Sequence, residues 1–270
     1  MGQAVQKLLD PNRVELVCFG DNSEKLQQSR ADVCSIGEAC RAGCDLMLIA
    51  VKGTERIRAL EEQIRACGYS GAIACLEDIS SLFDIRSSVT GRLAARIREM
   101  NVPGDVAELG VYRGDMAWQL NALFPDRELY LFDTFSGFAG EDVKKEEAGA
   151  FSGARPGDFS DTGAADVLSR MPHPERVIIR QGVFPETAEG LSDRQFAFVS
   201  MDADLYAPTL AGLEYFYPRL AEGGCIVLHD YDGTQFRGVR QAAADYEREQ
   251  NLRLKLVPLA DLHGSVVIVR

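Results

Sequence analysis

The sequence lacks an excess of basic residues, and this excludes proteins that bind polyanions through charge. Its 41 acidic and 29 basic residues give a formal net charge of −12, which repels phosphate backbones and anionic membranes. It also lacks an apolar run long enough to cross a bilayer, and it does not begin with a basic stretch followed by an apolar one. We therefore expect a cytoplasmic protein without a nucleic-acid partner or a membrane association.

The seven cysteines lack the paired C-x-x-C spacing that is typical of zinc sites. Cys34, Cys40 and Cys44 lie close together in the sequence, but no histidine lies near them. An odd number of cysteines without a secretory signal favours reduced thiols. We interpret them as structural or incidental thiols rather than as metal ligands.

The chain is long enough for one large and one small domain. It has 270 residues, of which 46% are hydrophobic, so a packed core is feasible. Residues 1–76 contain short apolar runs at 14–20, 45–51 and 71–75, each of which resembles a buried parallel strand. Polar, helix-favouring stretches separate these runs, which predicts a small α/β domain of half-Rossmann-like type. The expected helices are 24–31, 36–42 and 54–67.

Residues 77–270 are expected to form the large domain, beginning with a helical connector at 77–101 whose apolar residues recur near one face. After it come seven strand candidates with helices between most of them. The last two are separated only by residues 258–263, which predicts an antiparallel hairpin. Seven mostly parallel strands flanked by helices match the class I methyltransferase sheet. The strand candidates are 105–109, 128–133, 176–181, 196–201, 224–229, 253–257 and 264–269, and the helical stretches are 115–123, 163–170, 208–219 and 236–249.

A glycine-containing loop follows the first of these strands and leads into a helix. Glycines let the backbone pass close to a ligand, and the helix offers free N–H groups. The loop has the form G-x-x-x-G with an acid, Glu108, two residues before its first glycine, whereas a dinucleotide loop has the form G-x-G-x-x-G. A negatively charged Glu108 suits the cationic, phosphate-free ligand S-adenosylmethionine.

An acid also ends the next strand, where such residues accept hydrogen bonds from ribose hydroxyls. This residue, Asp133, has an alternative interpretation as a turn or capping residue. We favour contact with the cofactor. The candidate cofactor-binding residues of these two segments are Glu108, Gly110, Val111, Tyr112, Gly114, Asp133, Thr134 and Phe135.

Two pairs of polar residues follow neighbouring strands of the expected sheet. Asp202 and Asp204 follow one strand, and His229 and Asp230 follow the next. Ligands bind at the carboxyl ends of such strands, and clusters of oxygen ligands favour Mg²⁺ or Ca²⁺. A cation and a base both help a sugar hydroxyl to act as a nucleophile. An isolated D-x-D is ordinarily a helix cap or surface charge, but together with the second pair it favours a metal site.

Several motifs occur in the order that is typical of one family. They are ELGVYRGD, LFDTFSGF, the turn Phe159-Ser160-Asp161-Thr162, QGVFPET, MDADLY, YPRLAEGG and LHDY. Over residues 80–270 the chain resembles the macrocin and mycinamicin O-methyltransferases, a family that includes aminocoumarin sugar O-methyltransferases. The resemblance implies a class I fold, S-adenosylmethionine as methyl donor, and a Mg²⁺ ion that chelates two neighbouring sugar hydroxyls.

The resemblance also implies roles for the acids. Asp202 would bind the metal and also contact the cofactor, Asp204 would be the general base, and Asp230 would be a second metal ligand. Where the family has D-D-Y, this chain has His229-Asp230-Tyr231. His229 is open to three interpretations: a metal ligand, a base near its ordinary pKa of about 6.5, or a space-filling residue. As a ligand it would make Mn²⁺ or another divalent transition metal more plausible than in a site made only of carboxylates.

By the same resemblance, the adenosyl end of the cofactor would be bordered by Asp161, Gly182, Val183 and Phe184. The glycine-rich, charged stretch 139–163 is expected to form a mobile lid. Tyr206 and Tyr231 are candidates for the border of the acceptor pocket, or for packing.

These observations predict a metal-dependent O-methyltransferase that acts on a small hydroxylated, sugar-like acceptor and assembles as a homo-oligomer. One alternative is a nicotinamide-dependent sugar dehydrogenase or epimerase, but the sequence lacks its glycine loop and a Tyr-x-x-x-Lys pair. Another is a catalytically silent nucleotide- or sugar-binding protein. The acids Asp202, Asp204 and Asp230 count against that interpretation.

Overall fold

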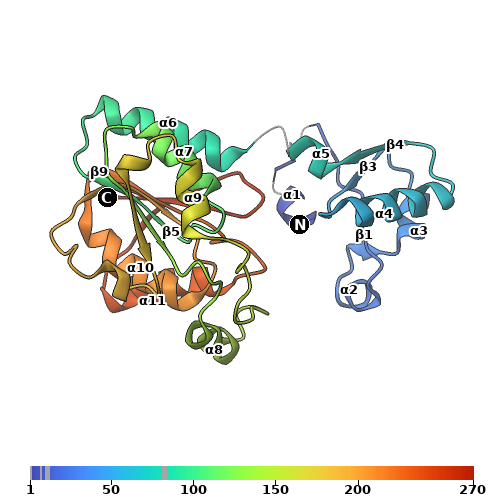
Figure 1. The fold of residues 1–270 in the computed structure, drawn as a ribbon. Helices are drawn as coiled ribbons and strands as arrows, with labels where there is room; N and C mark the ends of the chain where they lie inside the picture. Colours follow the sequence, from blue (N-terminus) through green and yellow to red (C-terminus); the bar gives the residue numbers. More distant parts are fainter. Residues whose placement is uncertain (1, 7, 10–12, 81–83) are drawn as a thin grey trace. The chain divides into compact units, whose positions relative to one another are not determined.

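The computed structural model describes residues 2–6, 8–9, 13–80 and 84–270. The chain forms two compact units, 1–84 and 85–270 (Figure 1). The sequence predicts the domain boundary near residue 77, with a helical connector at 77–101. Two helices occupy this connector, α5 (Leu76–Ser80) and α6 (Ile85–Glu99), and residues 81–83 lie outside the described part.

The small unit contains two separate pairs of parallel strands rather than one continuous sheet. Its core is small: the hydrophobic cluster among its described residues contains the buried side chains of Ile36, Ile49, Ile64 and Tyr69. The strands are β1 (Phe19–Gly20), β2 (Val33–Cys34), β3 (Leu46–Ile49) and β4 (Ala72–Cys75). The other helices are α1 (Gly2–Gln6), α2 (Glu24–Ser29), α3 (Ile36–Arg41) and α4 (Thr54–Ala66).

The prediction of a buried strand at 14–20 is wrong for most of its length. Only Phe19 and Gly20 pair, because their partner strand β2 is two residues long, and residues 14–17 are exposed. Because β2 is so short, the apolar residues before Phe19 have no strand to pair with in the described part of the chain. All seven cysteines are free thiols, as the sequence predicts.

The large unit is built on one seven-stranded sheet, which confirms the predicted strand number. Its order is β10-β11-β9-β8-β5-β6-β7, and β11 runs antiparallel to both of its neighbours, so the predicted final hairpin is also confirmed. The strands are β5 (Asp105–Leu109), β6 (Leu129–Asp133), β7 (Val177–Gln181), β8 (Phe196–Met201), β9 (Leu220–Leu228), β10 (Lys255–Pro258) and β11 (Val266–Val269).

Helices cover both faces of this sheet (Figure 1). One face packs on α6, α7 and α9, and the other on α8, α10 and α11. All six residues of the central strand β8 are therefore buried. The helices are α7 (Asp115–Leu123), α8 (Gly140–Gly149), α9 (Ala164–Arg170), α10 (Tyr206–Phe216) and α11 (Gly238–Glu249), with 3₁₀ turns η1 (Pro174–Arg176), η2 (Glu186–Ala188) and η3 (Tyr217–Arg219).

The strand order reverses between β5 and β8. From β5 the chain moves outward through β6 and β7, then returns to β8 on the other side of β5 and continues to β9. In open α/β sheets, ligands bind at the carboxyl ends of the strands at such a switch point. Throughout residues 2–6, 8–9, 13–80 and 84–270, every helix is too short or too polar to serve as a membrane span.

Candidate functional site

The glycine loop and the first acidic segment meet at the switch point. Gly110 has φ +84°, and a side chain there would collide with the backbone carbonyl of Asp202. The Asp202 N–H donates to the Leu109 carbonyl at 2.8 Å, which joins the two strand ends. Gly114, with φ +79°, precedes α7 and would meet Val167 if it carried a side chain. Both positions combine a positive φ with a close neighbour, a backbone at Gly110 and a side chain at Gly114, so glycine fits them best.

Asp133 holds the glycine loop in place. Its Oδ2 accepts hydrogen bonds from the N–H groups of Val111 at 2.7 Å and Tyr112 at 2.9 Å. Its Oδ1 accepts from the Phe135 N–H at 2.7 Å, and Thr134 Oγ1 donates to the Gly137 carbonyl at 2.7 Å. The alternative interpretation of Asp133 as a turn residue therefore describes a role that it has in this structure.

Left-handed backbone conformations concentrate at this edge of the sheet. Four residues other than glycine with positive φ follow its strands: Tyr112 at 50°, Phe135 at 51°, Asp204 at 59° and Asp230 at 56°. Such conformations cost energy for residues with a Cβ, and they cluster at functional sites. Backbone geometry by itself therefore points to the carboxyl edge of the sheet as the candidate site.

Glu108 is buried at the end of β5 with one carboxyl oxygen unpaired. It is 2% exposed, and its Oε2 has no hydrogen-bond partner among the described residues. Burial raises the pKa of Glu108 well above its usual range, and the charges of Asp202 and Asp133 add to this, whereas Arg86 opposes it. Burial therefore shifts Glu108 toward its neutral form, whereas the sequence suggested a charged carboxylate. A buried carboxyl without a partner is suited to a cationic ligand.

His229 lies between two acids. Its Nδ1 is 2.8 Å from Asp202 Oδ1 and 2.8 Å from Asp230 Oδ2. Burial acts to lower the pKa of His229, but the charge and hydrogen bond of Asp202 and the hydrogen bond of Asp230 outweigh it and raise the pKa to about 10. Arg86 Nη1 contacts the other oxygen of Asp202 at 2.5 Å. The two pairs of polar residues that were expected to converge, at 202/204 and 229/230, do lie together. Arg86 joins them, and the sequence did not predict it.

The carboxylates of Asp202, Asp204 and Asp230 are close enough to share one cation. One ligand oxygen from each lies within 4.8 Å of the others. Burial, followed by the charges of Asp202 and Asp230, raises the pKa of Asp204 well above its usual range. Burial works against ionisation of Asp230, yet hydrogen bonds from His229 and His263 outweigh it and lower its pKa. The group has the oxygen chemistry that divalent cations such as Mg²⁺ prefer.

His263 is a further member of this cluster that the sequence interpretation did not identify. It lies in the connection between β10 and β11, and its ring centroid is 4.7 Å from that of His229. Its Nδ1 is 3.8 Å from Asp230 Oδ1. The predicted hairpin could have indicated His263. Its connecting residues 258–263 lead into the last strand, and that strand lies beside the strand that ends just before His229.

The predicted adenosyl region is only partly assembled. A hollow of about 470 Å³ is lined by Tyr112, Gly153, Ala154, Asp158, Phe159, Asp161, Gln235 and Phe236. The Tyr112 hydroxyl donates to Asp161 at 2.8 Å, and Arg113 forms an ion pair with the same carboxylate. Gly182 and Val183 follow β7, but the Phe184 ring packs in the core against Phe132. The Phe184 side chain is therefore a packing residue here.

The stretch predicted to be a lid contains α8, which is anchored through Glu146. This side chain is fully buried, and it accepts hydrogen bonds from the Tyr206 N–H at 2.5 Å and the Ser152 hydroxyl at 2.7 Å. The Tyr206 ring stacks on Phe151, and its hydroxyl donates to Asp245 at 2.9 Å. Tyr206 thus has the packing role that was its alternative interpretation.

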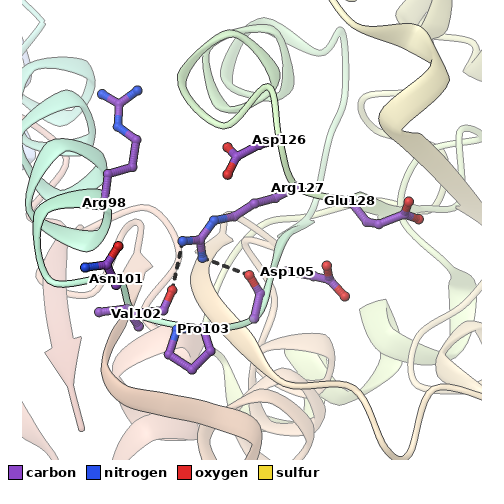
Figure 2. Close-up of a pocket in the computed structure, with 9 residues that line it drawn as sticks. Arg98, Asn101, Val102, Pro103, Asp105, Asp126, Arg127 and Glu128 are labelled. Atoms are coloured by element: carbon purple, nitrogen blue, oxygen red, sulfur yellow. Dashed lines mark hydrogen bonds between the residues drawn. The ribbon is translucent and has the colours of Figure 1, made fainter.

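A second hollow of about 530 Å³ lies at the opposite ends of the strands (Figure 2). The Arg127 guanidinium crosses it and donates to the carbonyls of Val102 and Gly104, both at 2.8 Å (Figure 2). Its walls include Asp105, the first residue of β5, and Glu128, which precedes β6. Arg127 therefore ties together the amino ends of the sheet, away from the acid cluster.

The chain is similar to three proteins that are named as O-methyltransferases. It is 27% identical over 186 residues to 8-demethyl-8-(2,3-dimethoxy-alpha-L-rhamnosyl)-tetracenomycin-C 4'-O-methyltransferase of Streptomyces olivaceus, which covers 63% of this chain and 66% of that protein. It is 24% identical to mycinamicin III 3''-O-methyltransferase of Micromonospora griseorubida, over 58% of this chain and 66% of that protein. It is 27% identical to demethyldecarbamoylnovobiocin O-methyltransferase of Streptomyces niveus, over 48% of this chain and 54% of that protein. The matched part of the chain thus spans between 54% and 66% of the length of these relatives.

Two solved structures share the fold. The O-methyltransferase NovP has a TM-score of 0.56 and 20% identity, over 68% of this chain and 79% of that chain. CalS11, a calicheamicin methyltransferase, has a TM-score of 0.51 and 19% identity, over 94% of this chain and 96% of that chain. These likenesses show that the large unit has the class I methyltransferase fold. Residues 86–266, more than half of the sequence, match the model of the macrocin O-methyltransferase (TylF) family, and the chain belongs to that family.

Proposed function

We propose that this protein transfers a methyl group from S-adenosylmethionine to a hydroxyl oxygen of a sugar-like acceptor, assisted by a divalent metal ion. One observation carries the proposal: the unpaired buried carboxyl of Glu108 lies at the same switch point as the cluster Asp202, Asp204 and Asp230. The first group is suited to a cationic methyl donor, and the second to activation of a hydroxyl. The names of the relatives support a sugar acceptor, because one methylates a rhamnosyl tetracenomycin.

The loop after β5 supports binding of the donor. Glycine at 110 lets the loop lie directly against the backbone of Asp202, and Glu108 presents an oxygen that has no hydrogen-bond partner among the described residues. A carboxylate has about four acceptor sites, so the three backbone hydrogen bonds to Asp133 leave capacity for a ribose hydroxyl. The hollow beside Tyr112 and Asp161 is the candidate site of the adenosyl end.

The acid cluster supports a metal ion and a base. Asp202 and Asp230 would hold the ion, which when bound lowers the pKa of an acceptor hydroxyl. In the ionised form that a nearby cation favours, Asp204 would accept the hydroxyl proton while the oxygen bonds to the methyl carbon. S-adenosylmethionine supplies that methyl group, and its sulfur keeps the electron pair of the broken carbon–sulfur bond. Arg86 orients Asp202 through its contact at 2.5 Å.

The experiment that tests this function separates chemistry from cofactor binding. Asp204→Asn is expected to lower the turnover of a glycoside or nucleotide-sugar acceptor by about 10²–10⁴-fold, the usual contribution of a general base. Affinity for S-adenosylmethionine, measured by calorimetry, should stay near that of the wild type. Asp193→Asn, at an exposed position before the amino end of β8, is the matched control. Undiminished product formation by the Asp204 variant, measured by mass spectrometry, would remove Asp204 as the base.

No observation favours the nicotinamide-dependent alternative, because the loop at 110–114 lacks a dinucleotide spacing. The homo-oligomer and the cytoplasmic location stay predictions. So do the half-Rossmann-like character of the small unit and its role, since a fold alone names no ligand.

A further inference from the structure

We propose that His229, Asp230 and His263 form a mixed nitrogen and oxygen site that binds a divalent transition-metal ion in preference to Mg²⁺. This inference rests on the proposed metal-assisted function and assigns its metal: Asp230 stays a ligand, and the two histidines take the place of Asp202. The three residues follow β9 or lie in the connection between β10 and β11. They bring together two imidazoles and one carboxylate.

The donor groups lie close together, and an ion that binds them displaces the proton that His229 shares with Asp202 and Asp230. One nitrogen of each histidine and one oxygen of Asp230 lie within 4.8 Å of one another. The rings of His229 and His263 are tilted by 32° with centroids 4.7 Å apart. His229 is nearly buried, whereas the His263 side chain is 43% exposed, so an ion can reach the group from solvent.

The backbone around His263 is held firmly, which makes its position a built feature. Asp261 Oδ1 accepts hydrogen bonds from the N–H groups of Gly264 at 2.7 Å and Ser265 at 2.9 Å. The Asp232 N–H donates to the Gly264 carbonyl at 2.9 Å. At Gly264, with φ +73°, a Cβ would lie 2.7 Å from Asp232 Cβ. The turn therefore presses against the segment that carries His229 and Asp230, and it orients His263 before any ion binds.

The donor atoms indicate which ion is preferred. Mg²⁺ requires oxygen ligands and keeps much of its water, whereas imidazole suits Zn²⁺, Co²⁺ and related ions. The all-oxygen group Asp202, Asp204 and Asp230 is a competing site, and it shares Asp230. There the guanidinium of Arg86 already contacts Asp202, so that group attracts a cation less strongly than three unpaired carboxylates would.

Use of the histidines also leaves the proposed base available. An ion bound by all three carboxylates would engage Asp204 as a ligand, which conflicts with its role as proton acceptor. An ion at His229, Asp230 and His263 leaves both oxygens of Asp204 out of the ligand set. The mixed site therefore agrees better with the proposed chemistry than the all-oxygen site does.

Metal binding by the full chain tests this proposal without an activity assay. Protein stripped with a chelator is titrated with Co²⁺ and, separately, with Mg²⁺, using calorimetry and the visible absorption of bound Co²⁺. Wild-type protein should bind Co²⁺ more tightly than Mg²⁺. His263→Ala and His263→Gln should weaken Co²⁺ binding about tenfold or more, since even indirect changes to a metal site cost about 10–100-fold in affinity. Mg²⁺ binding should be unchanged.

The third histidine of the chain offers a matched control. His173 precedes η1 and lies beside Glu175, so His173→Ala should bind Co²⁺ like the wild type. Thermal melting of the metal-free variants checks that they fold. The proposal is overturned if the His263 variants bind Co²⁺ normally, if they lose Co²⁺ and Mg²⁺ equally, or if the wild type does not bind Co²⁺.

Failure of this inference is distinguishable from failure of the proposed function. Co²⁺ binding that depends on His263 in a protein that methylates no acceptor would support the site and contradict the function. Methyl transfer by a protein whose Co²⁺ binding does not change when His263 is replaced would support the function and contradict the site.

Discussion

Glu108 shows at the residue scale how burial couples a ligand to a proton. Its pKa is raised by burial, which shifts the free protein toward the neutral carboxyl. A cationic ligand favours the ionised carboxylate, because opposite charges close together lower a carboxyl pKa. Binding of S-adenosylmethionine should therefore release a proton from Glu108, and its affinity should rise with pH until the free protein is also ionised there.

Calorimetry in buffers of different ionisation enthalpy measures this release directly. Glu108→Gln should abolish it and weaken cofactor binding roughly tenfold or more, since a hydrogen bond to a charged group contributes about 1.5–3 kcal/mol. Glu99→Gln, an exposed residue at the end of α6, should leave both quantities unchanged. A wild-type protein that binds the cofactor without proton release would contradict the coupling.

The acids of the site could be predicted from sequence because strand ends place them. Asp202 and Asp230 each follow an apolar run, and parallel strands bring such positions to one edge. The roles of Arg86 and His263 could not be predicted from sequence. Their neighbours depend on how a helix (for Arg86) and a hairpin connection (for His263) pack in the folded chain. His263 approaches Asp230 only because β11 lies beside β9, a fact of strand order rather than of spacing along the chain.

At the element scale, α8 depends on one buried acid. Glu146 connects this helix to the first residue of α10 and to Ser152. Glu146→Ala would leave a buried N–H unpaired, so the free energy of unfolding should fall by about 1.5–3 kcal/mol. Glu147→Ala, the exposed neighbour on the same helix, should change it little. Urea denaturation of both variants makes the comparison, and equal stabilities would show that Glu146 does not anchor α8.

The elements that were predicted most accurately carry a clear burial pattern: a fully buried strand, and a helix with one buried face. The strand at 196–201 and the helix at 115–123 have the bounds expected from the sequence. Helix α8 was missed because only Val143 and Glu146 are buried on it, so no apolar stripe marks it. The run at 14–20 misled for the opposite reason, since its apolar residues have no sheet to cover them.

On the scale of the whole molecule, two cores of very different size stabilise two compact units. A small core gives little stability, because the surface buried on folding grows with size. The unit at 1–84 should therefore unfold at a lower urea concentration than the unit at 85–270. The one tryptophan of the chain, Trp118 in α7, reports on the large unit alone.

Two matched core variants assign the transitions. Ile64→Ala should shift only the first transition, which circular dichroism detects and Trp118 fluorescence does not. Leu120→Ala should shift only the second, which both signals detect. Removing a large buried aliphatic side chain costs about 2–5 kcal/mol, enough to resolve each shift. Coincident transitions that both variants move together would mean that the units unfold as one cooperative structure, and the small unit would then derive its stability from the large one.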